Sequence, residues 1–423
     1  MDKEKIVFGL DIGTTKIVCL AGKLNEHGKL EVLGFGKAKS LGVRRGIVNN
    51  IMQTVESINY AVQKLEDKFG LKVDSVSTGI AGQHIRSVQH SDYITRSNPE
   101  KYIDKTDIEK LHQQVKQLIL LPGEEIIHVL AQEYKIDGQT EISQPEGMHG
   151  RRLEAGFHIV AGQTAAIKNI TKCVVEANLK VTTLNLEPLA SADAVLSPEE
   201  KEAGVVLVDI GGGTTDVAIF KDGIIKHTAV IPFGGNVITE DIKEGCSILQ
   251  KDAELLKIRF GSALPSENKE TEIVSIPGLR GREPKEISLK NLSKIIKARV
   301  EEIMDQVYRQ ITAYGFQEGK NKLIGGIVLT GGGSQLKHIK QLTEYITGMS
   351  TRIGYSNEHL SQATLEEDIS NPSYATSVGL VLRGLKVNNL QDIKDGGDEV
   401  TLHESTFFEN WSKKFLQYLL NEK

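Results

Sequence analysis

The sequence predicts an α/β fold in which two similar lobes enclose a nucleotide cleft. A similar polar turn occurs twice in the sequence, as DIGTTK at residues 11–16 and as DIGGGTTD at residues 209–216. Each copy directly follows an apolar, β-branched run, as expected where a strand ends in a tight hairpin. The order of elements around the first copy recurs around the second, which indicates an internal duplication. Two lobes of this kind place their turns face to face.

The elements of each lobe follow from hydrophobic periodicity and from turn residues. The first half predicts strands at 6–10, 16–23, 30–37 and 73–81 and a helix at 51–69. The second half predicts strands at 205–209, 216–221 and 223–232 and a helix near 237–249.

The segment 84–162 is more than either lobe requires. It has strand-like runs at 85–88, 128–136 and 157–161, and a helix is expected to start near Asp104, where Thr106 and Glu109 match a capping box. Because a structureless excursion of this length is rare in a compact protein, we expect a small inserted α+β subdomain.

Composition excludes several classes of protein. The chain has 423 residues and a net charge of −5, and no basic block is interleaved with aromatic residues, so we expect no nucleic-acid partner. Cys19, Cys173 and Cys246 lack C-x-x-C spacing, which argues against a disulfide framework or a zinc site and fits a reducing cytosol. The start of the chain has no apolar signal region, and no run approaches the length of a membrane span. Any membrane contact is therefore expected to be peripheral.

The repeated turn has the chemistry of a phosphate-binding loop. A glycine after the aspartate lets backbone N–H groups approach a phosphate, and the threonines add hydroxyl donors. Asp11 and Asp209 end facing strands, where two carboxylates can hold Mg²⁺ through water. Either turn alone is as typical of an ordinary hairpin, but two copies in the same context favour phosphate binding.

Three further segments predict the nucleoside side of the site. Residues 325–336 form an apolar strand that runs into three glycines and then a helix. Gly235 precedes a helix that begins near Asn236, whose first N–H groups are free. Glu254 and Lys257 share one helical face, a spacing suited to a ribose hydroxyl and an adenine edge, although such a pair is more often a solvated salt bridge.

The C-terminal end differs in composition from the rest. Residues 386–406 are polar and predict a disordered linker. Residues 407–423 predict an amphipathic helix whose apolar face suits the surface of a membrane and whose charge is only weakly basic. That face consists of Phe407, Phe408, Trp411, Phe415, Tyr418 and Leu419. The alternative is a helix that packs on its own body or in a partner's groove.

These residues resemble the actin, sugar kinase and DnaK-chaperone superfamily, and within it the FtsA family of bacterial cell-division proteins. The resemblance covers essentially the whole chain and implies duplicated actin-like (ribonuclease-H-like) lobes that bind ATP and Mg. It assigns the phosphate loops to Asp11, Gly13, Thr14, Thr15, Lys16, Asp209, Gly211, Gly212, Gly213, Thr214 and Thr215. It assigns the adenosine contacts to Glu254, Lys257, Gly332 and Gly333, and it places Glu187 where relatives orient the attacking water. Whether ATP is turned over at a useful rate stays open.

The resemblance also implies domains and partners. The domains are a first lobe (1–83, 163–193 and 357–385), the inserted subdomain (84–162), a second lobe (194–229 and 300–356) and a further subdomain (230–299). The implied protein lies on the cytoplasmic face of the inner membrane at the division site, polymerises head to tail, and meets anionic lipids and other divisome proteins. It binds the C-terminal peptide of the tubulin-like protein FtsZ on the 230–299 subdomain.

Three other functions use the same fold. A small-molecule kinase needs a substrate pocket with a catalytic base, and it has no use for an amphipathic tail. A DnaK-type chaperone needs a β-rich domain for which the chain has no room. A PilM-like pilus-assembly protein lacks the terminal helix. One segment, 267–286, is charged and contains proline, so we expect a mobile or partner-facing loop there.

Overall fold

Two five-stranded sheets with the same topology form the centres of the two lobes. The computed structural model describes residues 6–278, 283–316, 322–361 and 369–395. The first sheet has the order β11-β6-β1-β2-β3 and the second the order β18-β17-β12-β13-β14, so each strand of one has a counterpart in the other. The first comprises β1 (Val7–Ile12), β2 (Lys16–Leu24), β3 (Leu30–Lys39), β6 (Ser75–Ile80) and β11 (Lys180–Leu186). The second comprises β12 (Val205–Ile210), β13 (Thr215–Lys221), β14 (Ile224–Ile231), β17 (Gly326–Thr330) and β18 (Thr351–Ile353).

The pairing within the sheets confirms the duplication predicted from the repeated turn. β1 pairs antiparallel with β2 and parallel with β6, and β12 pairs antiparallel with β13 and parallel with β17. Every residue of β12 is buried, which explains its continuous apolar run, because a central strand covered on both faces has no polar side.

Helices cover the sheets, and some of them begin at a side-chain cap. In α1 (Ile51–Phe69), the Asn50 side chain accepts from the Gln53 N–H, and Gly70 ends the helix with φ 65°. Ser197 and Glu200 form a complete capping box at α5 (Pro198–Ala203). The others are α3 (Thr164–Glu176), α4 (Glu187–Val195), α6 (Gly235–Cys246), α7 (Gln250–Phe260), α8 (Leu289–Ala313), α9 (Ile339–Thr347) and α10 (Ala375–Asp395).

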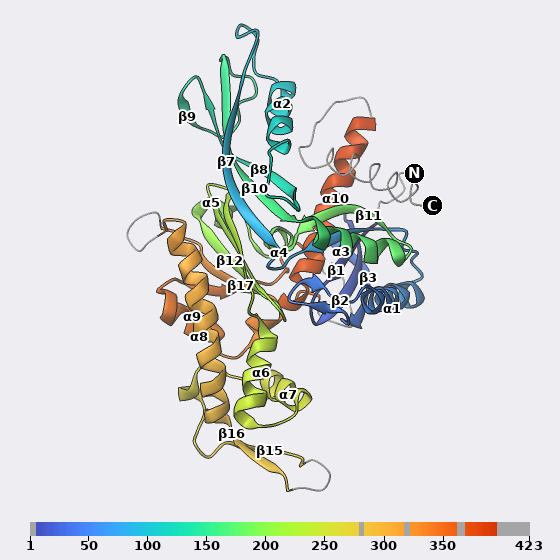
Figure 1. Cartoon of the computed structure of the whole chain (residues 1–423), viewed down its shortest axis with the longest axis vertical. Helices are drawn as coiled ribbons and strands as arrows, with labels where there is room; N and C mark the ends of the chain where they lie inside the picture. The colour runs from blue at the N-terminus through green and yellow to red at the C-terminus, as the bar shows by residue number, and fades with distance from the viewer. Residues whose placement is uncertain (1–5, 279–282, 317–321, 362–368, 396–423) are drawn as a thin grey trace.

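The inserted segment is a subdomain with its own sheet and its own apolar core, at the top of Figure 1. Its sheet has the order β7-β10-β8-β9, and α2 (Lys105–Lys116) packs on it. The strands are β7 (Ile85–Thr95), β8 (Glu124–Ile136), β9 (Gln139–Ile142) and β10 (Arg152–Gln163). The predicted capping box is wrong: the N-cap is Asp104, whose side chain accepts from the Asp107 N–H and from the Thr106 hydroxyl. Aspartate is the stronger cap, and it lies one position before the helix.

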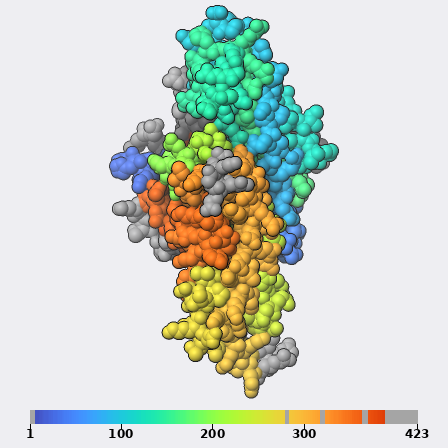
Figure 2. Space-filling view, turned by 90° about the vertical axis from the view of Figure 1, so that its left-hand side faces the viewer, coloured from blue at the N-terminus to red at the C-terminus, as the bar shows by residue number. Residues whose placement is uncertain are grey.

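The molecule is elongated, with the inserted subdomain at one end and a two-stranded hairpin at the other (Figures 1 and 2). That hairpin pairs β15 (Ile273–Ile276) with β16 (Lys285–Ser288), so the loop predicted for 267–286 is wrong where these strands form. Ile276 and Ile287, one from each strand, are buried in the core of this lobe.

The end of the chain differs from the prediction as far as it is described. Helix α10 continues to Asp395, so residues 386–395 are helical rather than linker. The predicted amphipathic helix at 407–423 lies outside the described residues. Among the helices of the described part, none is both long and apolar enough to cross a membrane.

Candidate functional site: a cleft between the two phosphate turns

A cavity of about 500 Å³ lies between the lobes and is lined by both repeated turns. This volume is within the usual range for small-ligand sites. The structure brings the predicted site residues together around it, with one exception. Those lining the cavity are Asp11, Gly13, Thr14, Thr15, Lys16, Glu187, Asp209, Gly211, Gly212, Gly213, Thr214, Gly235, Asn236, Glu254, Lys257, Gly332 and Gly333. Thr215 is the exception, because its hydroxyl donates to the Phe233 carbonyl at 2.8 Å.

The two turns pack directly against each other, and glycine makes this possible. A Cβ on Gly212 would lie 2.4 Å from Thr15 Cγ2, and a Cβ on Gly213 would lie 2.7 Å from Thr14 Oγ1. No larger residue fits at either position without separating the turns. The bare backbone is therefore exposed to the cavity at the point where a phosphate chain would cross from one lobe to the other.

Two aspartates, one from each lobe, are held by hydroxyl groups. Asp11 Oδ2 accepts from the Ser377 hydroxyl at 3.0 Å, and Asp209 Oδ2 accepts from Ser191 at 2.6 Å and from Thr376 at 3.3 Å. Burial, opposed by Lys16 and by the Ser377 hydrogen bond, raises the pKa of Asp11 to about 6. Burial likewise raises the pKa of Asp209. A nearby cation would therefore favour the ionised form of both groups.

Two further carboxyl groups complete the acidic cluster. Glu187 is the first residue of α4, and burial, together with the charges of Asp11, Asp216 and Asp209, raises its pKa well above the ordinary value. Asp216 was not predicted as a site residue, although it ends the second repeated turn. Its Oδ2 accepts from Thr214, and its Oδ1 is buried without a partner among the described residues. Its place as the final aspartate of DIGGGTTD is the sequence signal that could have identified it.

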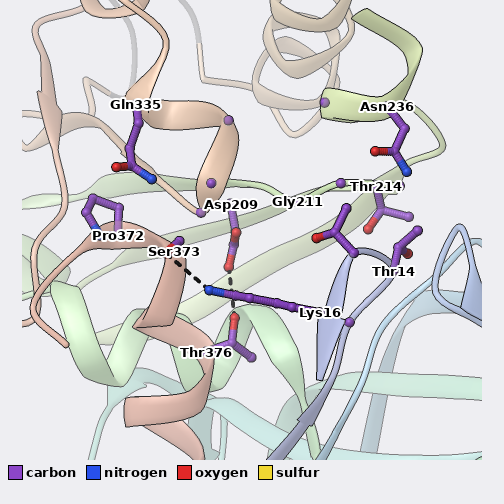
Figure 3. A pocket seen from close by; sticks show the side chains of 18 of the residues that line it. Thr14, Lys16, Asp209, Gly211, Thr214, Asn236, Gln335, Pro372, Ser373 and Thr376 are labelled. Carbon is purple, nitrogen blue, oxygen red and sulfur yellow. Dashed lines mark hydrogen bonds between the residues drawn. The ribbon is translucent and has the colours of Figure 1, made fainter. Parts of the chain in front are cut away.

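Lys16 projects into the cleft toward a segment that the sequence analysis did not predict to be part of the site. Its Nζ donates to Ser373 Oγ at 3.1 Å (Figure 3). The same Nζ lies 3.7 Å from the centre of the Tyr374 ring. Both partners belong to the 3₁₀ turn η4 (Pro372–Tyr374), directly before α10. No local pattern marks this turn as part of a site, because only tertiary folding brings it beside a turn at the start of the chain.

The nucleoside side of the cavity is formed by α6, α7 and a glycine turn. Glu254 Oε2 lies 2.8 Å from Lys257 Nζ, which also donates to the Gly235 carbonyl at 2.9 Å. The predicted helix after the three glycines is wrong in type: Gly332–Gln335 is a 3₁₀ turn, and α9 begins only at Ile339. Above Gly332 the space is open, since an added Cβ meets only Ser373 Cβ, at 4.0 Å.

The donor set fits a hydrated magnesium ion rather than one enclosed by protein ligands. In the described part of the chain, no three His, Cys, Asp or Glu residues form a metal-binding group. Asp11 and Asp209 both line the cavity, and Mg²⁺ commonly binds through one or two carboxylates, water and substrate phosphates.

Comparisons with known proteins agree with this architecture. A family model described as "Cell division protein FtsA" matches residues 206–379, and one described as "SHS2 domain inserted in FTSA" matches residues 82–161, the inserted subdomain. The chain is 39% identical to cell division protein FtsA of Pseudomonas aeruginosa over 90% of each chain. It is 33% identical to cell division protein FtsA of Escherichia coli K12, over 99% of this chain and 98% of the relative.

Solved structures show the same actin-like fold at low sequence identity. A chain of the PilM-PilN type IV pilus biogenesis complex has a TM-score of 0.63 and 16% identity, covering 90% of this chain and 99% of that one. MreB5 of Spiroplasma citri bound to ADP has a TM-score of 0.53 and 16% identity, covering 93% and 99%.

Proposed function

Because the chain belongs to the FtsA family of cell-division proteins, we propose that it is an ATP-binding protein that polymerises and tethers FtsZ filaments to the cytoplasmic membrane. The observation that carries the nucleotide part is the cavity itself. Both phosphate turns, the Gly331–Gly333 segment, the start of α6 and the middle and end of α7 converge on it. MreB5, which shares the fold, is described as bound to ADP.

Each group of lining residues has a role in this proposal. The bare backbone of Gly211–Gly213 and the hydroxyls of Thr14 and Thr214 receive the phosphates, while Glu254 and Lys257 meet the ribose and adenine. Asp11 and Asp209 would hold magnesium through water, and the ion would offset the repulsion between phosphates and carboxylates. The acidic cluster supports this assignment. Burial raises the pKa values of Asp11 and Glu187 and thereby favours their neutral forms, whereas a bound cation would favour the ionised forms.

Glu187 is the proposed residue for orienting a hydrolytic water. It lines the cavity beside Gly79, where an added Cβ would lie 2.7 Å from Glu187 Cγ. A side chain packed this closely has few alternative positions, which suits a group that must hold water in line with a phosphate. We propose weak hydrolysis, with nucleotide binding as the main task of the site.

The remaining parts of the proposal concern assembly. The inserted subdomain at 84–162 supplies a contact between copies in a head-to-tail filament, and the 230–299 subdomain receives the FtsZ C-terminal peptide. The segment 407–423 binds anionic lipid through Trp411, Phe415 and their apolar neighbours, at the inner face of the membrane where division occurs. Several such segments on one filament would add their affinities.

Nucleotide binding is tested by titrating the full chain with a fluorescent ATP analogue, with magnesium and with EDTA. Asp209→Ala should weaken magnesium-dependent binding at least tenfold, because it removes one of the two carboxylates. Glu26→Gln, at an exposed position that does not line the cavity, is the control for loss of a negative charge. Equal affinity in the wild type and Asp209→Ala would remove the metal assignment.

Membrane tethering is tested by flotation with liposomes of mixed zwitterionic and anionic lipid. Replacing Trp411 and Phe415 by Glu should abolish flotation and leave ATP affinity unchanged. Replacing Asn410 and Gln417 by Glu adds the same charge on the predicted polar face, and this variant should still float with the liposomes. FtsZ should sediment with liposomes only when the wild-type chain is present. Flotation that survives deletion of 407–423 would favour a PilM-like function instead.

A further inference from the structure

We propose that Thr376 and Ser377, in the first turn of α10, are positioning residues for Asp209 and Asp11, and that through them α10 responds to nucleotide in the cleft. The inference rests on the proposed binding of Mg·ATP between the lobes. It concerns residues that neither the repeated turns nor the comparisons single out. Its basis is the way one helix touches both acidic strand ends.

The first contact fixes Asp11. Ser377 is fully buried, and its hydroxyl donates to Asp11 Oδ2 at 3.0 Å. The other oxygen, Oδ1, faces the first phosphate turn, since an added Cβ on Gly13 would lie 3.7 Å from it. One carboxylate oxygen is therefore anchored on α10, and the other is left for a ligand. Such anchoring sets the plane of the carboxylate before any ligand arrives.

The second contact fixes Asp209 in the same manner. Its Oδ2 accepts from Thr376 at 3.3 Å and from Ser191 of α4 at 2.6 Å, and these two hydroxyls lie 3.0 Å apart (Figure 3 shows Thr376 beside Asp209). Its Oδ1 lies on the side of the Gly331 turn, where an added Cβ would be 2.3 Å away. Both aspartates thus use Oδ2 for hydroxyls and keep Oδ1 on the side of the glycine turns.

Close backbone packing holds these hydroxyls in place. A Cβ on Gly379 would lie 1.8 Å from the Ala190 carbonyl oxygen, so α10 and α4 cross in direct contact. A Cβ on Gly9 would lie 3.0 Å from the Ser377 carbonyl oxygen, so β1 and α10 are also closely packed. Because Asp11 lies on β1 and Ser191 lies on α4, neither hydroxyl can shift without moving a strand or a helix.

The two contacts differ in what they span. Helix α10 packs on β1 and β2 of the first lobe, whose strand β1 carries Asp11. Asp209 lies on β12 of the second lobe, so the Thr376 contact crosses the cleft. A change in lobe separation must strain the Thr376 contact and leave the Ser377 contact intact. Helix α10 runs from this point to Asp395, directly before residues 396–423, so cleft closure is transmitted to the helix that precedes the C-terminal segment.

The test measures ATP affinity across a magnesium titration, with EDTA as the metal-free reference. Ser377→Ala and Thr376→Val should each lower affinity about tenfold at saturating magnesium and change it less than twofold in EDTA. Thr376→Ser, which keeps the hydroxyl, should restore wild-type magnesium dependence. Thr343→Val removes a buried hydroxyl of α9 that bonds only within its helix, and it should have no effect.

Hydrogen exchange of the full chain gives a readout that a purely structural role would not change. Mg·ATP should slow amide exchange along α10 at least threefold in the wild type and in Thr376→Ser, but not in Thr376→Val. Equal magnesium dependence in all variants, or equal protection of α10, would overturn the inference. A wild-type chain that fails to bind Mg·ATP would instead overturn the proposed function, so the two failures are distinguishable.

Discussion

Asp216 stands directly opposite Asp209 in the register of the β12–β13 hairpin, with both side chains buried at the cavity. Burial, reinforced by the charge of Asp209, raises the pKa of Asp216 to about 8. Asp216 is therefore neutral near pH 7, and a neutral carboxyl can donate a hydrogen bond where an ionised one would repel a phosphate. We therefore expect the pair to divide two tasks: Asp209 would hold a cation, and Asp216 would donate a hydrogen bond to the ligand.

Substitution of Asp216 tests this division. Asp216→Asn replaces a neutral carboxyl by a neutral amide of the same shape, so ATP affinity at pH 7 should change less than about threefold. Asp216→Ala removes the donor, a loss of about 1.5 kcal/mol, and should weaken binding about tenfold. Titration with a fluorescent ATP analogue provides the measurement. A tenfold loss in Asp216→Asn would show that the ionised form is required.

The contact between the two turns predicts a strict requirement for glycine at 213. Gly213→Ala places a Cβ 2.7 Å from Thr14 Oγ1 of the other turn and 2.8 Å from Arg45 Cα, so the backbone here must shift, and ATP affinity should fall at least tenfold. Gly156→Ala is the control, since a Cβ there meets nothing within 4 Å. Isothermal titration calorimetry measures the ATP affinity of both variants. Equal affinities would mean that the turns need not touch.

Asp193 on α4 predicts a strong effect on stability away from the site. Its carboxylate lies within 3.2 Å of Lys201, Arg383 and Lys386, the last two on α10. Burial opposes ionisation, but the three cations outweigh it and hold the pKa of Asp193 well below its usual value. Asp193→Asn removes the negative charge that Lys201, Arg383 and Lys386 share in a largely buried setting, and it should destabilise the protein by about 3 kcal/mol.

Urea unfolding measures the Asp193 effect against Glu26→Gln as an exposed control. The difference between wild type and Asp193→Asn should persist at all pH values above about 4, where an unfolded aspartate is ionised. It should shrink as the pH falls further toward the depressed pKa, because the carboxylate then takes up a proton. A difference of less than 1 kcal/mol at pH 7 would contradict the prediction.

His158 predicts a loss of stability in mild acid. It is fully buried where the inserted subdomain meets β14, and its Nε2 lies 3.0 Å from Thr228 Oγ1 while its Nδ1 lies 3.2 Å from Gln89 Nε2. Burial, with the nearby His227 and His128, lowers the pKa of His158 to about 4. An unfolded histidine takes up a proton below about pH 6.5, whereas the folded one does so only near pH 4.

The contribution of neutral His158 to the free energy of unfolding should therefore be fully present above about pH 6.5 and be lost between pH 6.5 and 4. Over that range His158 should lower the free energy of unfolding by up to about 1.4 kcal/mol per pH unit. His158→Gln should reduce this slope by about one proton in urea unfolding at a series of pH values. The exposed His27→Gln should leave the slope unchanged. An unchanged slope in His158→Gln would assign the acid sensitivity to other groups, such as the buried His84.

Local patterns in the sequence were sufficient for the fold and for most of the candidate site. The repeated DIG turns, with their apolar strands, placed Asp11 and Asp209 correctly at facing strand ends, because strand, turn and glycine signals act over a few residues. The inserted subdomain followed from its own periodicity. The same local signals misassigned α2's cap, the β15–β16 hairpin and the start of the linker after residue 385.

What the sequence by itself determined is the duplicated architecture and the chemistry of the two phosphate turns, because each is encoded in adjacent residues. Tertiary structure alone decided which distant groups complete the cleft. Ser373, Thr376 and Ser377 lie more than 350 positions from Asp11 in the chain and reach the cleft only because α10 crosses α4 and packs on β1. Their effect depends on the direction and burial of side chains, which only packing fixes.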